Sequence, residues 1–210
     1  MTTIIENLKW RYATQKFDTS KTIAPEDLET ILEAGNLSAT AYGLQPLQMV
    51  VVTDPEKKQA LIPAAYNQTH VGDNSALIVL AARTDIDEAY ISEYTARIEA
   101  TRRLPEGTTD GYKTMMVNDL TNRTPEARLI WAQKQAYIVL GTLMAAASEL
   151  RIDNHALEGF NPTEFNQILD LEKHNLTATV ILALGYRSRS DDTQHWAKVR
   201  KPLNDIVVRI

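Results

Sequence analysis

The chain has 210 residues, of which 44% are hydrophobic and 23% charged, as expected for a globular protein of one domain. Its formal net charge of -5 and its lack of a basic tract argue against nucleic acid as a partner, because phosphate backbones are bound by clustered positive charge. The absence of cysteine excludes disulfides, thiolate nucleophiles and iron-sulfur clusters. The N-terminus has no apolar signal core and no window is apolar enough to span a bilayer, so we expect a cytoplasmic protein with no membrane partner.

The first part of the chain alternates short helices with apolar strands. Acidic residues in the first turn support the second helix, and the second strand is apolar throughout, which indicates a sheet covered on both faces. Small residues and a proline indicate a loop over 36–46, and a second loop is expected over 66–75. We predict helices over 3–10, 24–37 and 55–65, and strands over 47–53 and 76–82.

Residues 85–122 are more charged and look like an excursion from a single domain over 1–210. Two helical segments, 85–104 and 112–120, flank turn residues at 105–111.

The longest helical pattern covers 124–152, where Thr124 can cap the helix and Pro125 suits its first turn. Apolar residues occupy most of its circumference rather than one stripe, so we expect a helix buried on all sides. The chain must either wrap this helix completely or pack it against a second copy, and we favour the second copy.

The last part of the chain is predicted as a connection over 153–162, a helix over 162–169 and a strand over 177–186. A short basic segment over 196–202 precedes a final strand over 206–210, which must join an existing sheet edge. Strands separated by helices predict an α+β or α/β sandwich, and the strand order stays open.

Several familiar sites are absent from the sequence. It contains no G-x-G-x-x-G, no phosphate loop ending in Gly-Lys-Ser/Thr, no G-x-S-x-G, and no pair of histidines with metal-ligand spacing, so we predict no metal site. Three cations remain, Arg11, Lys198 and Arg200, of which the last two share one face if the chain is extended. They could bind a phosphate dianion, or they could be solvated surface charges.

Several segments resemble motifs of the flavin-dependent nitroreductase family, in the same order along the chain. Arg11 to Asp18 is similar to its Arg-x-Ser-x-x-x-Phe signature, and Ser38 to Pro46 is similar to its Ser-Pro-Ser-Ser-x-x-x-Gln-Pro loop. The others are Asn67-x-x-His70-x-x-Asp73-x-Ser75, Glu158-Gly159-Phe160 and Lys198-x-Arg200, so the likeness covers almost the whole chain.

The resemblance implies an α+β fold with a central mixed or antiparallel sheet, in an intertwined homodimer that binds FMN at two interface sites. Arg11, Lys198 and Arg200 would bind the FMN phosphate, with Tyr12 and Ala13 along the phosphate and ribityl chain. Asn67, Gln15 and His70 would lie near the pyrimidine part of the flavin, and the backbone of Glu158 and Gly159 near N5. The other subunit would supply Ala39, Thr40, Ala41, Tyr42 and Gly43, and Met115 and Tyr42 would contact the substrate.

The activity implied by the resemblance is hydride transfer from NADH or NADPH, through flavin N5, to a nitroaromatic, quinone or pteridine acceptor in a ping-pong cycle. Two alternatives stay open: another flavin reaction, such as flavin reduction or dehalogenation, and a non-catalytic flavin-binding or scaffold protein. Gln15 and His70 stand where well-known members have lysines, so only a protonated His70 could supply positive charge there. We therefore expect a lower flavin potential than in lysine-bearing relatives, and activity that falls as His70 loses its proton.

Overall fold

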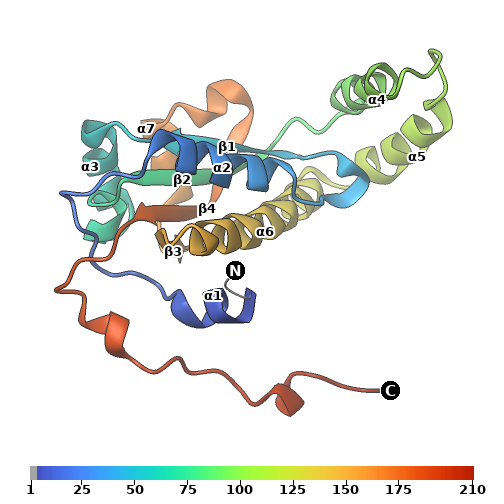
Figure 1. Cartoon of the computed structure of the whole chain (residues 1–210). Helices are drawn as coiled ribbons and strands as arrows, with labels where there is room; N and C mark the ends of the chain where they lie inside the picture. The colour runs from blue at the N-terminus through green and yellow to red at the C-terminus, as the bar shows by residue number, and fades with distance from the viewer. Residues whose placement is uncertain (1–3) are drawn as a thin grey trace.

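The computed structural model describes residues 4–210 and is built on an antiparallel sheet of four strands (Figure 1). These are β1 (Leu47–Val52), β2 (Ala76–Arg83), β3 (Asp153–Leu157) and β4 (Leu176–Gly185), in the spatial order β1-β2-β4-β3. The predicted strands at 47–53, 76–82 and 177–186 are confirmed. The predicted connection at 153–162 is wrong in its first half, because the polar stretch from Asp153 to Leu157 forms β3 on the edge of the sheet.

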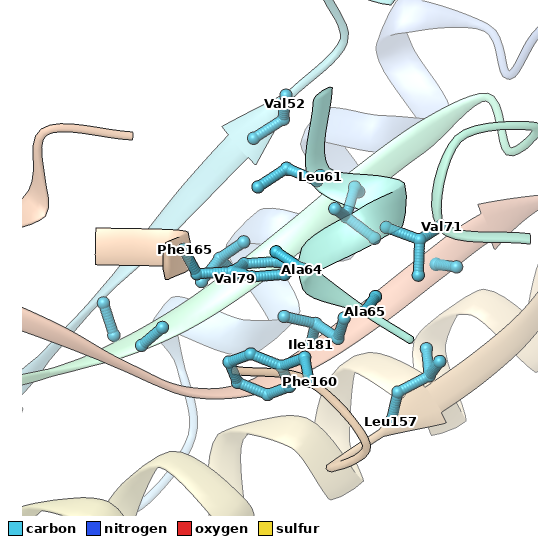
Figure 2. Close-up of a cluster of buried hydrophobic side chains, with 14 of the residues drawn as sticks. Val52, Leu61, Ala64, Ala65, Val71, Val79, Leu157, Phe160, Phe165 and Ile181 are labelled. Atoms are coloured by element: carbon cyan, nitrogen blue, oxygen red, sulfur yellow. The ribbon is translucent and has the colours of Figure 1, made fainter. Parts of the chain in front are cut away.

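Side chains alternate across the sheet, and each face has its own helical layer. Leu77 and Val79 of β2 pack in the core beneath α3 (Pro55–Ala64) and α7 (Pro162–Ile168). Figure 2 shows this core, where Leu61 of α3 and Phe165 of α7 lie against the sheet. Ile78 and Leu80 pack on the other face against α2 (Pro25–Asn36) and α6 (Pro125–Glu149). Both faces of the central strands are therefore covered, as their continuous apolar sequence predicts.

The long helix α6 begins as predicted, since the Thr124 hydroxyl accepts a hydrogen bond from the amide of Ala127 at 3.2 Å. The expectation that α6 is buried on all sides is wrong within one chain. Ile130, Tyr137 and Ile138 are 53%, 41% and 47% exposed, because the sheet and α2 cover only one side of the helix. An apolar strip of α6 is therefore open in the single chain.

Three further parts of the chain lie outside these layers. The helices α4 (Glu88–Arg102) and α5 (Asp110–Thr121), predicted at 85–104 and 112–120, project beyond the sheet in Figure 1. The N-terminal helix is α1 (Ile4–Trp10), while Thr3 of the predicted helix lies outside the described residues. After β4 the chain passes α1 and runs away from the sheet.

The predicted final strand at 206–210 is wrong for the single chain, because no strand among residues 4–210 pairs with this segment. A short 3-10 helix, Leu203–Asp205, precedes it, and Ile206, Val208 and Ile210 are exposed. Among residues 4–210, none of the helices has both the length and the apolar character needed to cross a bilayer.

Candidate functional site

An N-terminal segment, residues 9–15, and a C-terminal segment, residues 193–200, meet at a cavity of about 400 Å³. The Lys198 ammonium donates to the carbonyl of Leu8 at 2.5 Å and to the carbonyl of Arg11, so it caps the C-terminus of α1. This cavity, called the cation cavity below, contains six of the residues predicted to bind cofactor. They are Arg11, Tyr12, Ala13, Gln15, Lys198 and Arg200.

Three positive side chains of the cation cavity influence one another. Burial and then the charge of Arg200 lower the pKa of Arg11, and burial followed by the charges of Arg11 and Arg200 lowers the pKa of Lys198. Within residues 4–210, no carboxylate lies within ion-pair distance of any of the three. Uncompensated cations that repel one another around a hollow form a site suited to an anion.

The buried carboxylate of Asp191 connects the N-terminal segment of this cavity to the C-terminal one. Asp191 is 1% exposed, and its Oδ2 accepts hydrogen bonds from the amide of Gln15 at 2.9 Å and the hydroxyl of Tyr12 at 3.0 Å. Its Oδ1 accepts from the amide of Thr193 at 3.1 Å. Sequence reasoning missed Asp191, although an Asp two residues before a Thr is a signal for an Asx turn.

The edge strand β3 carries the N-terminal segment. Asn154 is 1% exposed, its Oδ1 accepts a 3.1 Å hydrogen bond from Arg11 Nε, and Ala13 forms a parallel bridge with it. His155 Nδ1 lies 2.9 Å from the carbonyl of Thr14. The sequence did not predict Asn154 and His155 as site residues either, because polar residues do not indicate a strand. That same character positions Arg11 and Ala13.

The side chain of His70 is buried against β3 rather than exposed as a charged group. Its ring stacks on His155 with centroids 4.3 Å apart, and the residue is 6% exposed. Burial, and secondarily His155, lower the pKa of His70 to about 4, so the ring is neutral at pH 7. The positive charge expected near the flavin requires a protonated His70, and that form is disfavoured at neutral pH because charging a buried imidazole beside another is unfavourable.

The loops that carry Asn67 and Glu158 to Gly159 are joined by Gln68. Gln68 Nε2 donates to the carbonyl of Gly159 at 2.6 Å and to the carbonyl of Ala65 at 2.9 Å. Asn67 is exposed with a φ of 60°. The Glu158 carboxylate accepts a 2.8 Å hydrogen bond from the Tyr137 hydroxyl. Glu158 and Gly159 directly follow the last residue of β3. The loops that carry Asn67, Glu158 and Gly159 therefore lie along the same edge of the sheet as the cation cavity.

The remaining predicted residues lie elsewhere in the chain. The Ala41 amide donates to Gln135 of α6 at 2.8 Å, whereas α1 contacts the other end of α6 through Asn7 and Glu149. Gln135 and Glu149 are fourteen positions apart in α6, which corresponds to about 21 Å of helix. Ala39, Thr40, Ala41, Tyr42 and Gly43, together with Met115 on α5, are therefore not brought to the cation cavity of the same chain.

Comparison with known proteins agrees with this architecture. Residues 8–186 match the model of the Nitroreductase family. YfkO of Bacillus subtilis, assigned by name as an NAD(P)H nitroreductase, is 32% identical over 217 residues, covering 98% of this chain and 96% of the relative. The Major NAD(P)H-flavin oxidoreductase of Aliivibrio fischeri is 30% identical over 215 residues, covering 97% of each chain. A nitroreductase-type protein of Exiguobacterium sibiricum, solved in complex with FMN, superposes with a TM-score of 0.85 at 23% identity, covering 100% of this chain and 98% of the other. The chain belongs to the nitroreductase family.

Proposed function

We propose that the chain binds FMN with its phosphate in the cation cavity, at Arg11, Lys198 and Arg200. The observation that carries this proposal is the cluster of cations without a carboxylate partner in the described residues, whose chemistry fits a phosphate dianion. The ring system would extend past Ala13 and Gln15 towards Asn67, His70, Glu158 and Gly159 along the edge formed by β3. When bound, FMN supplies a ring that accepts and passes on a hydride.

The proposed activity is an NAD(P)H-dependent reduction of a nitroaromatic, quinone or pteridine acceptor by a ping-pong cycle. The names of YfkO and its relatives support the reductant and the reaction class. In this cycle the chain binds and orients its ligands rather than exchanging protons. Glu158 already accepts a hydrogen bond from Tyr137, so its role is to fix the backbone of the loop that also contains Gly159. The name of the Aliivibrio fischeri relative favours a second candidate acceptor, free flavin.

We also propose that the working form is an intertwined homodimer of single-domain subunits in the cytoplasm. The open strip of α6 at Ile130, Tyr137 and Ile138 and the exposed residues 206–210 are surfaces that a second copy would cover. β1 is an outer strand with no neighbour on one side among the described residues, so the C-terminal segment of the other copy could pair there. The separation of 39–43 from the cation cavity supports the same arrangement, since each loop would reach the other copy's flavin.

The decisive experiment is the colour of the purified protein and its response to reductant. An FMN enzyme is yellow and loses its colour anaerobically on addition of NADH or NADPH. Protein that stays colourless after incubation with FMN contradicts the proposal and supports a scaffold. Oxidation of NADH with free FMN but not with a quinone or nitroaromatic would select the second acceptor. A monomer by light scattering of dilute, FMN-saturated protein would refute the dimer.

A further inference from the structure

A second cavity, of about 620 Å³, lies at the other end of α6, between η1 (Ala41–Gly43), α4 and α5. It is separate from the cation cavity, with which it shares no lining residue. Three tyrosines, two aliphatic residues and one arginine dominate its wall, and we call it the tyrosine cavity. These residues are Tyr42, Tyr94, Tyr112, Ile98, Leu104 and Arg102.

The hydroxyl groups of this wall are already used within the protein. The hydroxyls of Tyr94 and Tyr112 both donate to the carbonyl of Tyr42, at 2.7 and 3.0 Å, and the Tyr42 hydroxyl donates to Asp119 at 2.8 Å. The hydroxyl of Thr108 donates to the carbonyl of Pro105 at 2.6 Å. The aromatic side chains therefore present ring surface to the cavity rather than free donors.

Arg102 is the exception in this wall. It is exposed, and within residues 4–210 no carboxylate lies within ion-pair distance of its guanidinium. Two acids that contact lining residues of the cavity, Glu99 and Asp119, already have partners. Glu99 accepts from the amide and hydroxyl of Thr109 at 2.8 and 2.7 Å, and Asp119 pairs with Arg123 at 2.8 Å. The cavity thus combines apolar walls with one uncommitted cation.

The floor of the tyrosine cavity is held in a fixed shape. Tyr42 and Gly43 have φ of 61° and 71°, a left-handed conformation that a side chain at Gly43 would strain. A Cβ at Gly43 would also lie 2.5 Å from the Tyr94 hydroxyl oxygen. The two hydroxyl groups on the Tyr42 carbonyl hold this turn against both α4 and α5, so the cavity is formed before any ligand enters.

We propose that the tyrosine cavity binds the acceptor and selects aromatic anions, with the ring against the tyrosines and a carboxylate or similar anion at Arg102. This inference rests on the proposed function, since Tyr42 and Gly43 belong to the loop expected beside the flavin of a second copy. The planar guanidinium of Arg102 suits a delocalised anion such as a carboxylate. The tyrosine rings suit contact with the aromatic ring of the acceptor. Arg102 is in this view a specificity residue for the acceptor.

The test compares 4-nitrobenzoate with its neutral methyl ester as acceptors of the FMN-loaded enzyme. In Arg102→Gln, kcat/KM for nitrobenzoate should fall about tenfold, as expected for loss of one charge-assisted interaction, whereas the value for the ester should change less than about twofold. Arg97→Gln is the matched control, because Arg97 lies on the same helix but pairs with Glu93 at 3.2 Å. It should leave both acceptors unchanged.

An equal fall for both acceptors, or no fall, would overturn the proposal. So would an increase in KM for NADPH but not for NADH in Arg102→Gln, since the anion bound would then be the nucleotide phosphate. Calorimetric titration of the oxidised protein with 4-nitrobenzoate measures binding to the tyrosine cavity directly. It therefore tests this proposal even if the proposed enzymatic activity fails. If the protein never oxidises NADH, weaker binding to Arg102→Gln than to Arg97→Gln still supports the cavity, and equal binding refutes it.

Discussion

The cation cavity and the tyrosine cavity, at opposite ends of α6, are built in contrasting ways. In the first, one buried carboxylate, Asp191, organises the backbone, while Arg11, Lys198 and Arg200 have no carboxylate partner among residues 4–210. In the second, the hydroxyl groups bond to the protein itself and the walls are mainly apolar, with a single unpaired cation at Arg102. The first design suits permanent binding of a highly charged cofactor. The second suits repeated exchange of substrates.

Removing Asp191 should have the largest effect and would test whether one carboxylate organises the cation cavity. Asp191→Ala leaves the amides of Gln15 and Lys16 without their acceptor in a buried place, and we expect a loss of about 3 kcal/mol in the free energy of unfolding. Thermal unfolding should shift down by about 10 °C. Asp192→Ala is the control because Asp192 is exposed, and an equal shift in both variants would contradict the role of Asp191.

Neutralising Arg200 should weaken FMN binding without lowering the stability of the fold. Its guanidinium is exposed and donates to the carbonyl of the adjacent Val199, so Arg200→Gln should leave the melting temperature of FMN-free protein unchanged. The FMN dissociation constant, measured by flavin fluorescence, should rise about 10- to 100-fold, because a charge-assisted interaction with phosphate is lost. Arg189→Gln, at another exposed arginine, should have no such effect. Equal affinities in the two variants would place the phosphate elsewhere.

A methyl group at Gly43 probes the rigid floor of the tyrosine cavity. Gly43→Ala requires an L side chain at a φ of 71° and movement of the Tyr94 ring, so we expect a loss of about 1–2 kcal/mol in unfolding free energy. Gly111→Ala, at a helical glycine with open space around it, should be neutral or slightly stabilising. If Gly43→Ala is equally harmless, the turn is not fixed by Tyr94.

The smallest expected effect concerns pH and the His70 ring. Because burial lowers the pKa of His70 to about 4 from an ordinary value of 6.5, the unfolded chain binds the extra proton first as the pH falls. Wild type should therefore lose stability between pH 6.5 and 4 relative to His70→Phe, by about 1 kcal/mol at pH 6. Denaturant titrations at several pH values measure this difference.

The sequence predicted the apolar parts of the molecule well. β2 and β4 were found because burial on both faces requires continuous apolar residues, and α6 was found from its cap and length. The meeting of Arg11 with Lys198 was also predicted, through the family resemblance rather than through spacing.

The errors arose where three-dimensional surroundings decide the outcome. β3 was missed because Asn154 is buried by hydrogen bonding rather than by apolar character. The protonation state of His70 could not be predicted, because its pKa depends on burial and on a stacked neighbour far away in the sequence. A strand at 206–210 was predicted, yet no strand in the described part of the chain pairs with this segment.

Lys198 and Arg200 line the cation cavity, and residues 203–210, which begin with the 3-10 helix Leu203–Asp205, follow them directly in the chain. Whatever immobilises residues 203–210 will also restrict where those two charges can lie, and the free-energy coupling must act equally in the opposite direction. If a second copy binds residues 203–210, the affinity for the cofactor should consequently depend on protein concentration. Dilution would then release flavin before any secondary structure is lost.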